Sequence, residues 1–286
     1  MLFVSQGLCI LKGHTFFPTP KISLPMRKFL LCIAVGMLFL TALPAQDQGD
    51  LYLIIELMRV DESQSNAYWE TEQFWSKIHQ QRANAGEIIG WDLWSLQPSG
   101  EDQGYQYMTV TLFKSFKDMI SGEGNFQSHL KAAYPNMKED ELMKKFNRTS
   151  ASRDLAIRLY MRQVASTQDD FSMPLGTFAT MAVMQQLSDD YEDIEAGVFQ
   201  PLHQAAIEAG QMGSWGLLRI LFPAGSDRYA SHWAVNMYKD AAQFAAYNMG
   251  DGESDMVTDL GVERGLESRD MKKVMMAKLE MKVRKQ

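Results

Sequence analysis

Two histidines at matching places in the chain are the residues best suited to acid–base or ligand chemistry. Residues 74–80 read FWSKIHQ and residues 198–204 read VFQPLHQ, so His79 and His203 each follow an aromatic and apolar pattern of the same spacing. Histidine changes charge near neutral pH and can act as a proton shuttle, a hydrogen-bond donor or a haem ligand. We interpret both as candidate catalytic residues. The alternative is a half-buried histidine that bonds a neighbouring loop in each copy.

Glu72 is the third catalytic candidate, because it precedes His79 by two helical turns and shares its helix face. From there its carboxylate could orient the imidazole. The second copy has Ala196 at the position that matches Glu72, with Glu192 and Glu195 nearby. The acidic residue is therefore not repeated at the matching position.

Five further residues are candidates for contact with a ligand. Trp91 and Trp215 each begin the second predicted strand of a copy, where an aromatic ring can wall a pocket or simply belong to the core. Alternate residues of the third predicted strands share one face. Those faces carry Tyr107, Thr109 and Thr111 in the first copy and His232, Ala234 and Asn236 in the second. Either these residues line a cavity in one half, or they form a hydrogen-bonded layer between the sheets.

The charge and the cysteine content of the chain exclude several classes of function. The chain holds 28 Lys and Arg against 35 Asp and Glu, and residues 1–45 contain four of the basic residues and none of the acidic ones. Without that segment the net charge falls from −7 to −11, which disfavours contact with the phosphates of a nucleic acid. Both cysteines, Cys9 and Cys32, lie in the same segment, and the remaining histidines lack zinc-site spacing. We predict no metal site and no cofactor.

The first 45 residues have the character of a targeting segment. Met26 opens a short basic stretch, an apolar run follows to Leu43, and the sequence turns polar directly after Ala45. The run is shorter than the roughly 20 residues that span a membrane. We expect a start at Met26 with 1–25 as an upstream mis-start, a signal peptide at 26–45 cleaved near Ala45, and a periplasmic or secreted protein without stable membrane insertion. The alternative is an uncleaved N-terminal anchor.

The matched histidines belong to a longer internal repeat. At an offset of 124 residues, Ala85-Gly86 meets Ala209-Gly210 and Trp91 meets Trp215. Further matches follow with small shifts: Pro98-Ser99-Gly100 with Pro223-Ala224-Gly225, Phe113-Lys114 with Tyr238-Lys239, and Ser152-Arg153-Asp154-Leu155 with Ser268-Arg269-Asp270-Met271. The ordered matches predict two copies of one unit. The Ser-Arg-Asp stretch is interpreted as a turn at the entry of the last strand, with a bound anion at the arginine as the alternative.

Each copy has the pattern strand, helix, strand, strand, helical region, strand. The first strands, 51–60 and 177–187, are apolar on both faces. The helices, 68–85 and 191–209, carry apolar residues at helical spacing and end at a glycine. The remaining elements are hairpins at 91–113 and 214–238, mainly helical stretches at 114–146 and 239–266, and last strands near 155–164 and 271–283.

The order βαββαβ is that of the ferredoxin-like split βαβ unit, whose sheet has helices on one face only. A tandem copy can cover the other face. We therefore predict an α+β fold of two tandem ferredoxin-like repeats, 51–166 and 177–284, joined by a linker at 167–176, with their antiparallel sheets packed face to face.

With this topology and the matched Phe/Trp-x-x-Ile/Leu-His-Gln, Trp and Ser-Arg-Asp positions, the chain resembles the dimeric α/β-barrel superfamily over about residues 51–283, with both subunits fused in one chain. The resemblance implies a small-molecule site between helices and sheet, and the superfamily includes cofactor-free monooxygenases, muconolactone isomerase-like proteins and haem-binding members. We expect an exported protein that binds a small, largely apolar molecule, with monooxygenase- or isomerase-like catalysis as an option. A non-catalytic structural or interaction protein and a haem-binding protein are the alternatives, and the protein is expected to be a monomer or a further homodimer.

Overall fold

The computed structural model describes residues 51–98, 100–122, 124–248 and 256–286. The upstream segment 1–25 and the signal peptide 26–45 that we expect from the sequence lie outside these residues. No helix in the described ranges combines the length and the apolar character that crossing a membrane requires.

The described chain is an α+β protein with an antiparallel sheet, and the sheet closes into a barrel. Around the barrel the strands follow the order β1-β3-β2-β8-β5-β7-β6-β4. Their bounds are Tyr52–Arg59 (β1), Gly90–Gln97 (β2), Tyr107–Phe113 (β3), Asp154–Ser166 (β4), Phe178–Gln186 (β5), Ser214–Phe222 (β6), His232–Tyr238 (β7) and Arg269–Arg284 (β8).

Two strand pairs join the first half of the sequence to the second. β2 pairs with β8, where Trp91 lies opposite Val283, and β4 pairs with β6, where Arg162 lies opposite Arg219. The two sets of four strands are therefore hydrogen-bonded to each other at both edges as well as facing each other across the interior. Every strand of the described sheet is therefore paired on both sides.

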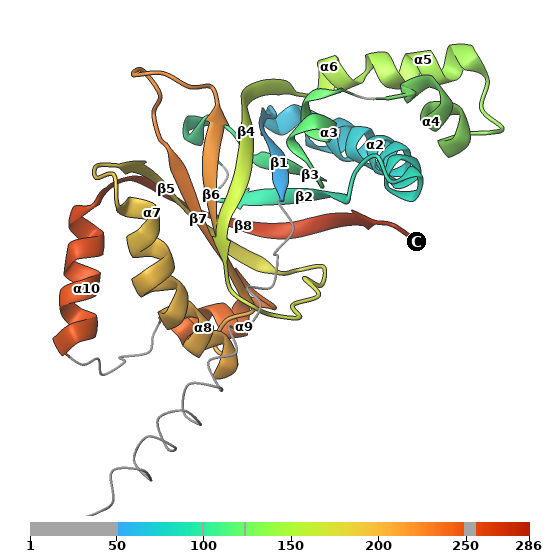
Figure 1. Cartoon of the computed structure of the whole chain (residues 1–286). Coiled ribbons are helices and arrows are strands. Elements are labelled where there is room, and N and C mark those ends of the chain that lie inside the picture. Colours follow the sequence, from blue (N-terminus) through green and yellow to red (C-terminus); the bar gives the residue numbers. More distant parts are fainter. Residues whose placement is uncertain (1–50, 99, 123, 249–255) are drawn as a thin grey trace, which may run out of the picture. The chain divides into compact units, whose positions relative to one another are not determined.

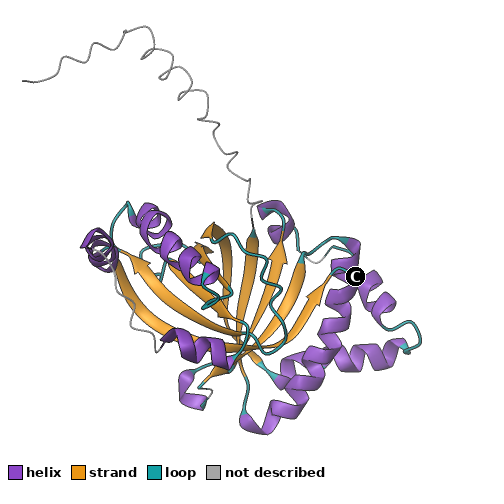
Figure 2. Ribbon diagram, turned by 90° about the horizontal axis from the view of Figure 1, so that it is seen from below, coloured by secondary structure: helices purple, strands orange, loops and turns teal. Residues whose placement is uncertain are grey.

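The helices form two groups on the outside of the sheet, one beside β1, β3 and β2 and the other beside β5 and β7 (Figures 1 and 2). The first group comprises α2 (Ser65–Ala85), α3 (Phe116–Ile120), α4 (Phe126–Ala133), α5 (Glu139–Asn147) and α6 (Thr149–Ser152). The second comprises α7 (Tyr191–Ile194), the π-helix η4 (Glu195–Phe199), α8 (Gln200–Glu208), α9 (Ala241–Asn248) and α10 (Met256–Glu267). Short 3-10 turns lie at Glu62–Gln64 (η2) and Glu101–Gln103 (η3).

The barrel interior is one apolar core. Successive residues of a strand point to opposite faces, so Leu53 and Ile55 of β1 point inward while Ile54 and Glu56 point outward. Every strand contributes to this core, for example with Leu53, Trp94, Met108, Met161, Met181, Leu218, Trp233 and Leu279. The outward faces form separate clusters beneath the two helix groups.

Helix α2 is the element that positions the candidate residues of the first half. It packs against β2 and β8 as well as α4 and α6. Its buried stripe recurs every three to four residues, as a helix that covers a sheet requires, and includes Tyr68, Glu72, Ile78, His79 and Arg82. The helix ends at Gly86, whose φ of 79° is the left-handed conformation that glycine adopts most easily.

The helix that matches α2 in the second half contains one extra residue. Glu72 and His79 are seven positions apart, whereas Glu195 and His203 are eight apart. The π-helix η4 lies between the latter two, and a π-turn accommodates one inserted residue without breaking the helix. Glu195, not Ala196, therefore pairs with Arg269 as Glu72 pairs with Arg153, which corrects the match expected from a constant offset.

Candidate functional site

A cavity of about 320 Å³ lies between α2 and the outward face of the sheet in the first half of the chain. Three of the predicted residues, Glu72, His79 and Trp91, line it together. The other side chains around it come from α2, β1, β3, β4, the end of α3 and the residue before β4, and include Glu56, Trp75, Arg82, Thr109, Thr111, Phe113, Arg153, Arg158 and Tyr160. The helical spacing of residues on α2 and the alternation of residues along the strands therefore bring polar and aromatic side chains together in one pocket.

Glu72 is the most deeply buried acid of this cavity, with 1% of its surface exposed. Its carboxylate Oε1 accepts a short hydrogen bond from Nη1 of Arg153, at the entry of β4. Burial raises the pKa of Glu72 to about 7, although Arg153 and Tyr68 pull it down. A carboxyl group with that pKa can both accept and donate a proton near neutral pH.

Two contacts hold α6, and with it Arg153, against α2. Thr71 and Ser152 share a hydrogen bond of 2.9 Å between their hydroxyls, and the indole Nε1–H of Trp75 donates to Thr149 Oγ1 at 2.9 Å. These contacts place the Arg153 guanidinium beside Glu72 although the two residues are 81 positions apart in the sequence.

His79 is held flat between aromatic rings. Its imidazole stacks on Trp91, with ring centres 5.0 Å apart and planes at 15°, and on Trp75, with ring centres 5.7 Å apart and planes at 28°. Burial, reinforced by the charges of Arg82 and Arg153, lowers the pKa of His79 well below its usual value. The ring is therefore neutral at physiological pH.

The neighbouring arginine determines the tautomer of His79. Nη1 of Arg82 lies 3.2 Å from Nδ1 of His79. A guanidinium only donates, so Nδ1 must accept, and the proton of the neutral ring resides on Nε2. His79 is thus a hydrogen-bond donor at Nε2, and its lone pair is occupied. A haem ligand or a general base would need that lone pair, and the arrangement fits neither role.

Glu72 and His79 line the same cavity, but the contacts of Glu72 run to Arg153 and those of His79 to Arg82 and the two indoles. The expected orientation of His79 by Glu72 is therefore replaced by orientation through Arg82. None of the described contacts joins His79 to Glu72, although both side chains line the cavity from α2.

The third-strand residues face outward, toward α2. Thr109 and Thr111 line the cavity, and Thr109 Oγ1 donates to Glu56 Oε2 at 3.2 Å. Tyr107 instead packs on Tyr68, with ring centres 4.5 Å apart, away from the cavity lining. The alternative of a hydrogen-bonded layer between the sheets is therefore wrong for these residues, since Met108 and Val110 occupy the inward face.

The second half repeats several of these contacts. His203 stacks on Trp215, with ring centres 5.2 Å apart and planes at 22°, and Arg269 forms a buried ion pair with Glu195. The guanidinium of Arg269 also lies over the ring of Phe199, 4.4 Å from its centre. Burial, aided by the charge of Arg269, lowers the pKa of His203 to about 4. Its Nδ1 is buried without a hydrogen-bond partner among the described residues.

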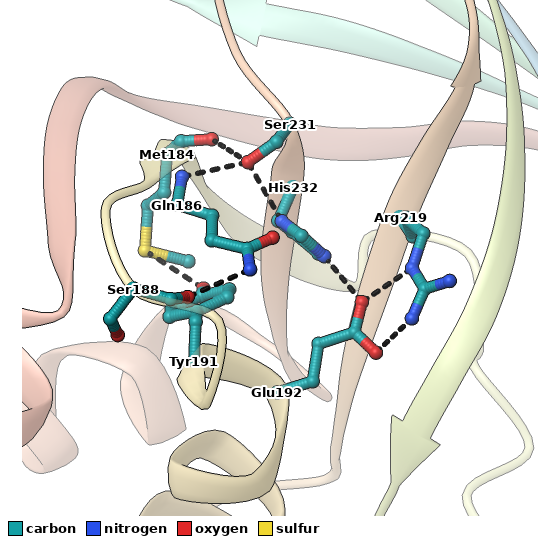
Figure 3. Close-up of polar contacts among 8 residues, drawn as sticks. All are labelled: Met184, Gln186, Ser188, Tyr191, Glu192, Arg219, Ser231 and His232. Carbon is teal, nitrogen blue, oxygen red and sulfur yellow. Dashed lines mark hydrogen bonds and ion pairs between the residues drawn. The ribbon is translucent and has the colours of Figure 1, made fainter.

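His232 belongs to a separate polar network in the second half (Figure 3). Its Nδ1 lies 2.8 Å from Ser231 Oγ and its Nε2 lies 2.7 Å from Glu192 Oε1, while Arg219 donates two hydrogen bonds to the same carboxylate. Burial raises the pKa of Glu192, but the hydrogen bonds from His232 and Arg219 outweigh it and lower the pKa to about 2. Both nitrogens of His232 are thus occupied, and the residue is 1% exposed. This network fixes α7 to β6 and β7.

Asn236 lies on β7, next to the first strand of its own half. Its Nδ2 donates to Thr180 Oγ1 at 3.2 Å across the β5–β7 pair, while its Oδ1 is buried without a described partner. The candidates of the second half therefore fall into three places: His203 of α8 stacked on Trp215, His232 beside α7, and Asn236 on the β5–β7 pair. Unlike Glu72, His79 and Trp91, they do not line one described cavity.

Arg82, Arg153, Arg158 and Glu56 are site residues that sequence reasoning missed or assigned to another role. Arg158 donates from Nε to Glu56 Oε1 at 2.7 Å, at the rim of the cavity. A usable signal existed for Arg153, because the Ser-Arg-Asp stretch recurs in both copies. Glu56 was also visible as the one charged residue within an otherwise apolar first strand, Tyr52–Met58.

The fold resembles solved structures of other proteins. A putative monooxygenase from Lactobacillus acidophilus NCFM aligns with a TM-score of 0.52 at 9% identity, over 83% of this chain and 97% of that one. A putative monooxygenase from Fusobacterium nucleatum aligns with a TM-score of 0.52 at 9% identity, over 82% and 94%. An anthrone oxidase-like protein aligns with a TM-score of 0.52 at 10% identity, over 83% and 94%. These neighbours are ferredoxin-like dimeric α/β-barrel proteins, and at such low identity the likeness concerns the fold alone.

No protein-family model matches the chain, and no curated protein matches it by sequence.

Proposed function

We propose that the protein is a small-molecule-binding α/β-barrel enzyme that transfers a proton on a small organic acid in the cavity beneath α2. The observation that carries this proposal is Glu72, a buried carboxyl group whose pKa is raised to about 7 and which lines a cavity of about 320 Å³. Titratable groups with strongly shifted pKa values in a cavity are concentrated at catalytic sites.

The charges around the cavity favour an anionic ligand. Three arginines, Arg82, Arg153 and Arg158, face two glutamates, Glu56 and Glu72, and Glu72 is partly protonated at neutral pH. Arg82 also lies 3.7 Å from Glu87, outside the lining, so the positive charge available to a carboxylate or an enolate is that of Arg153 when Glu72 is protonated.

The shape of the lining favours a flat organic group next to that charge. The aromatic side chains Trp75, Trp91, Phe113 and Tyr160 all line the cavity. A neighbouring hollow of about 470 Å³ beside α5 and α6 shares Trp75 and Arg153 with it, which offers a route for a substrate. The ligand we propose is therefore more polar than the largely apolar molecule expected from the sequence.

The proposed role of each residue follows from its protonation state and from the hydrogen bonds that it can make. Glu72 in its carboxylate form removes a proton from carbon next to a carbonyl group, and the electron pair of that C–H bond moves to the carbonyl oxygen. Arg153 and the Nε2–H of His79 stabilise the resulting enolate as hydrogen-bond donors. Glu72 then returns the proton to the same or another carbon, which yields exchange or isomerisation without any further reagent.

Monooxygenation is the second candidate reaction, and the names of the fold neighbours favour it. An enolate formed by Glu72 is the electron-rich species that reduces molecular oxygen, with one oxygen atom bonded to the carbon and the other leaving as water, so the two candidates share their first step. The non-catalytic alternative is disfavoured because the first half does contain a cavity between helix and sheet.

We propose that the chain consists of two fused ferredoxin-like units of which only the first acts on the substrate. The stacked His203 and Trp215 and the pair of Glu195 with Arg269 support a common origin of the halves.

We also propose that residues 26–45 are cleaved and that the protein works outside the cytoplasm. The mass of the chain isolated from its host tests the cleavage.

Proton abstraction can be tested without knowing the natural substrate. The protein is incubated in D₂O with enolisable aryl keto acids such as phenylpyruvate, and loss of the exchangeable C–H signal is followed by NMR. The unaltered protein should accelerate the exchange, and Glu72→Gln should slow it by about 100-fold or more. Glu195→Gln, which disrupts the corresponding buried pair in the second half, is the control and should exchange normally. No acceleration by the unaltered protein, or equal exchange by Glu72→Gln, contradicts the proposal.

A further inference from the structure

A second cavity, of about 340 Å³, lies inside the barrel and shares no lining residue with the cavity beneath α2. The strand alternation separates the two: Leu53 and Ile55 of β1 line the interior cavity, while Ile54 and Glu56 line the outer one. Both halves of the chain contribute to its walls, with Val110 from β3 and Ala179 from β5. It is therefore a feature of the closed barrel and not of either half alone.

The walls of this interior cavity are mostly apolar and adaptable, with polar side chains at Gln163, Ser166, Thr167 and Ser214. Four methionines line it, Met108, Met173, Met181 and Met237, together with the indoles of Trp94 and Trp233. Methionine side chains are flexible and polarizable and adjust to ligands of different outline, and apolar cavities of this kind accept hydrocarbon molecules.

Three charged residues line the cavity, and two of them neutralise each other, while Asp169 lies exposed at the rim and accepts hydrogen bonds from Thr167 Oγ1 and the backbone N–H of Phe171. Asp92 and Arg284 both line it, and Arg284 donates to both carboxylate oxygens of Asp92, at 2.6 and 2.9 Å. Because this bidentate pair satisfies both ions, it provides no unpaired charge for an ionic ligand. Since the remaining charge is the exposed carboxylate of Asp169, the lining disfavours an anion, and its buried part fits an uncharged molecule, in contrast to the arginine-rich cavity beneath α2.

The segment that joins β4 to β5 covers the interior cavity. Its Met173 is buried in the barrel core and lines the cavity, and it holds a φ of 49°, which residues other than glycine seldom adopt. Nζ of Lys282 on β8 donates to the carbonyl oxygens of Ser172 at 2.6 Å and of Met173 at 2.9 Å. A strained backbone conformation of this kind persists only where neighbouring groups stabilise it, and the two hydrogen bonds from Lys282 stabilise it here.

We propose that the barrel interior is a second binding site, for a small uncharged hydrocarbon-rich molecule, and that Met173 is its plug. The site is independent of the proposed reaction beneath α2. A ligand enters when the 167–177 segment lifts Met173 from the core, and the thioether then closes over it.

The neutral fluorophore N-phenyl-1-naphthylamine is a suitable probe, because its emission rises in apolar surroundings and it can quench the indoles of Trp94 and Trp233. The unaltered protein should bind it and lose tryptophan emission. Ala179→Phe and Val110→Phe fill the interior from opposite walls and should each weaken binding by about 10-fold or more. Thr111→Phe fills the cavity beneath α2 instead and should change the affinity by less than about twofold.

A measurement on the unaltered protein makes the test independent of how these variants fold. With ¹³C-methyl methionine, the probe should shift the NMR signals of Met181 and Met237, which line the interior, and leave that of Met119, which lines the cavity beneath α2. Absence of binding, shifts confined to Met119, or full affinity in both interior variants would overturn the proposal.

Discussion

Nη1 of Arg82 lies 3.2 Å from Nδ1 of His79, and this contact assigns the imidazole its role. Because the guanidinium can only donate, it occupies the lone pair of the ring and leaves the proton on Nε2. The stacked indoles of Trp75 and Trp91 hold the ring in that orientation. The acid–base function of the cavity consequently falls to Glu72, whose burial raises its pKa to about 7.

Replacing His79 should therefore affect the rate of the proposed reaction but not its pH midpoint. In His79→Phe the stacking on Trp91 is kept and the Nε2–H donor is lost. We expect proton exchange to slow by roughly 10- to 100-fold, with the pH midpoint still set by Glu72. His203→Phe in the second half is the control and should exchange as the unaltered protein does. A changed pH midpoint in His79→Phe would instead identify the imidazole as the titrating group.

The buried Glu72 should also make stability depend on pH. The folded protein keeps this proton up to about pH 7, whereas an unfolded glutamate loses it near 4.5. The contribution of Glu72 is therefore fully present below pH 4.5 and is lost as the pH rises to 7, by on the order of 3 kcal/mol. Chemical denaturation of Glu72→Gln between pH 4.5 and 7 should show a free energy of unfolding that falls less steeply than in the unaltered protein.

The control for that experiment is Glu70→Gln, because Glu70 lies on the exposed side of the same helix. Its pH dependence should follow that of the unaltered protein. Equal slopes for all three proteins would mean that Glu72 is ionised in the folded state throughout this range.

His203 should destabilise the fold at acid pH. Burial lowers its pKa to about 4 from a usual value of 6.5. The unfolded chain binds a proton below pH 6.5 while the folded chain does not, so stability is complete above 6.5 and is lost as the pH falls to 4, by at most about 3 kcal/mol. In His203→Phe this acid-side loss should be smaller, as measured by the melting temperature at pH 7 and at pH 4.5. An identical loss in both proteins would show that His203 is freely protonated when folded.

Close packing of α10 on η4 makes one glycine intolerant of a side chain. A Cβ on Gly265 would clash with Cε2 of Phe199, whereas a Cβ on Gly197 of η4 would meet nothing within 4 Å. Gly265→Ala should therefore destabilise the protein by about 1–3 kcal/mol. Gly197→Ala should be neutral or stabilising by up to about 1 kcal/mol, since alanine is the better helix former. Denaturant unfolding of the two variants measures the difference, and equal effects would contradict the packing described.

Much of the fold could be predicted because its periodicities are strong. The spacing of Trp75, Ile78 and His79 predicted α2, and the two-residue alternation of the strands placed Thr109 and Thr111 on one face. The antiparallel α+β architecture follows from those patterns together with the order of the elements. The pairing of β2 with β8 and of β4 with β6 could not be predicted, because nothing local in a strand specifies its partner in the other half.

The candidate site was predictable only where its residues come from adjacent elements. Glu72, His79 and Trp91 lie on one helix and the strand that follows it, and they line one cavity. Arg153 comes from 81 positions beyond Glu72, so its role depends on tertiary packing that the sequence does not display. Glu195 was missed as the counterpart of Glu72 because a constant helical period was assumed where the chain forms the π-turn of η4.

The titration of Glu72 decides whether the cavity can carry out the proposed proton transfer. Carboxyl ¹³C NMR of protein labelled at glutamate, with Glu72→Gln used to assign the signal, reports the titration of this group alone. We predict a midpoint near pH 7, well above the usual 4.5. A midpoint at or below 4.5 would mean that Arg153 keeps the carboxylate charged, and Glu72 could not serve as the proton donor and acceptor of the cavity.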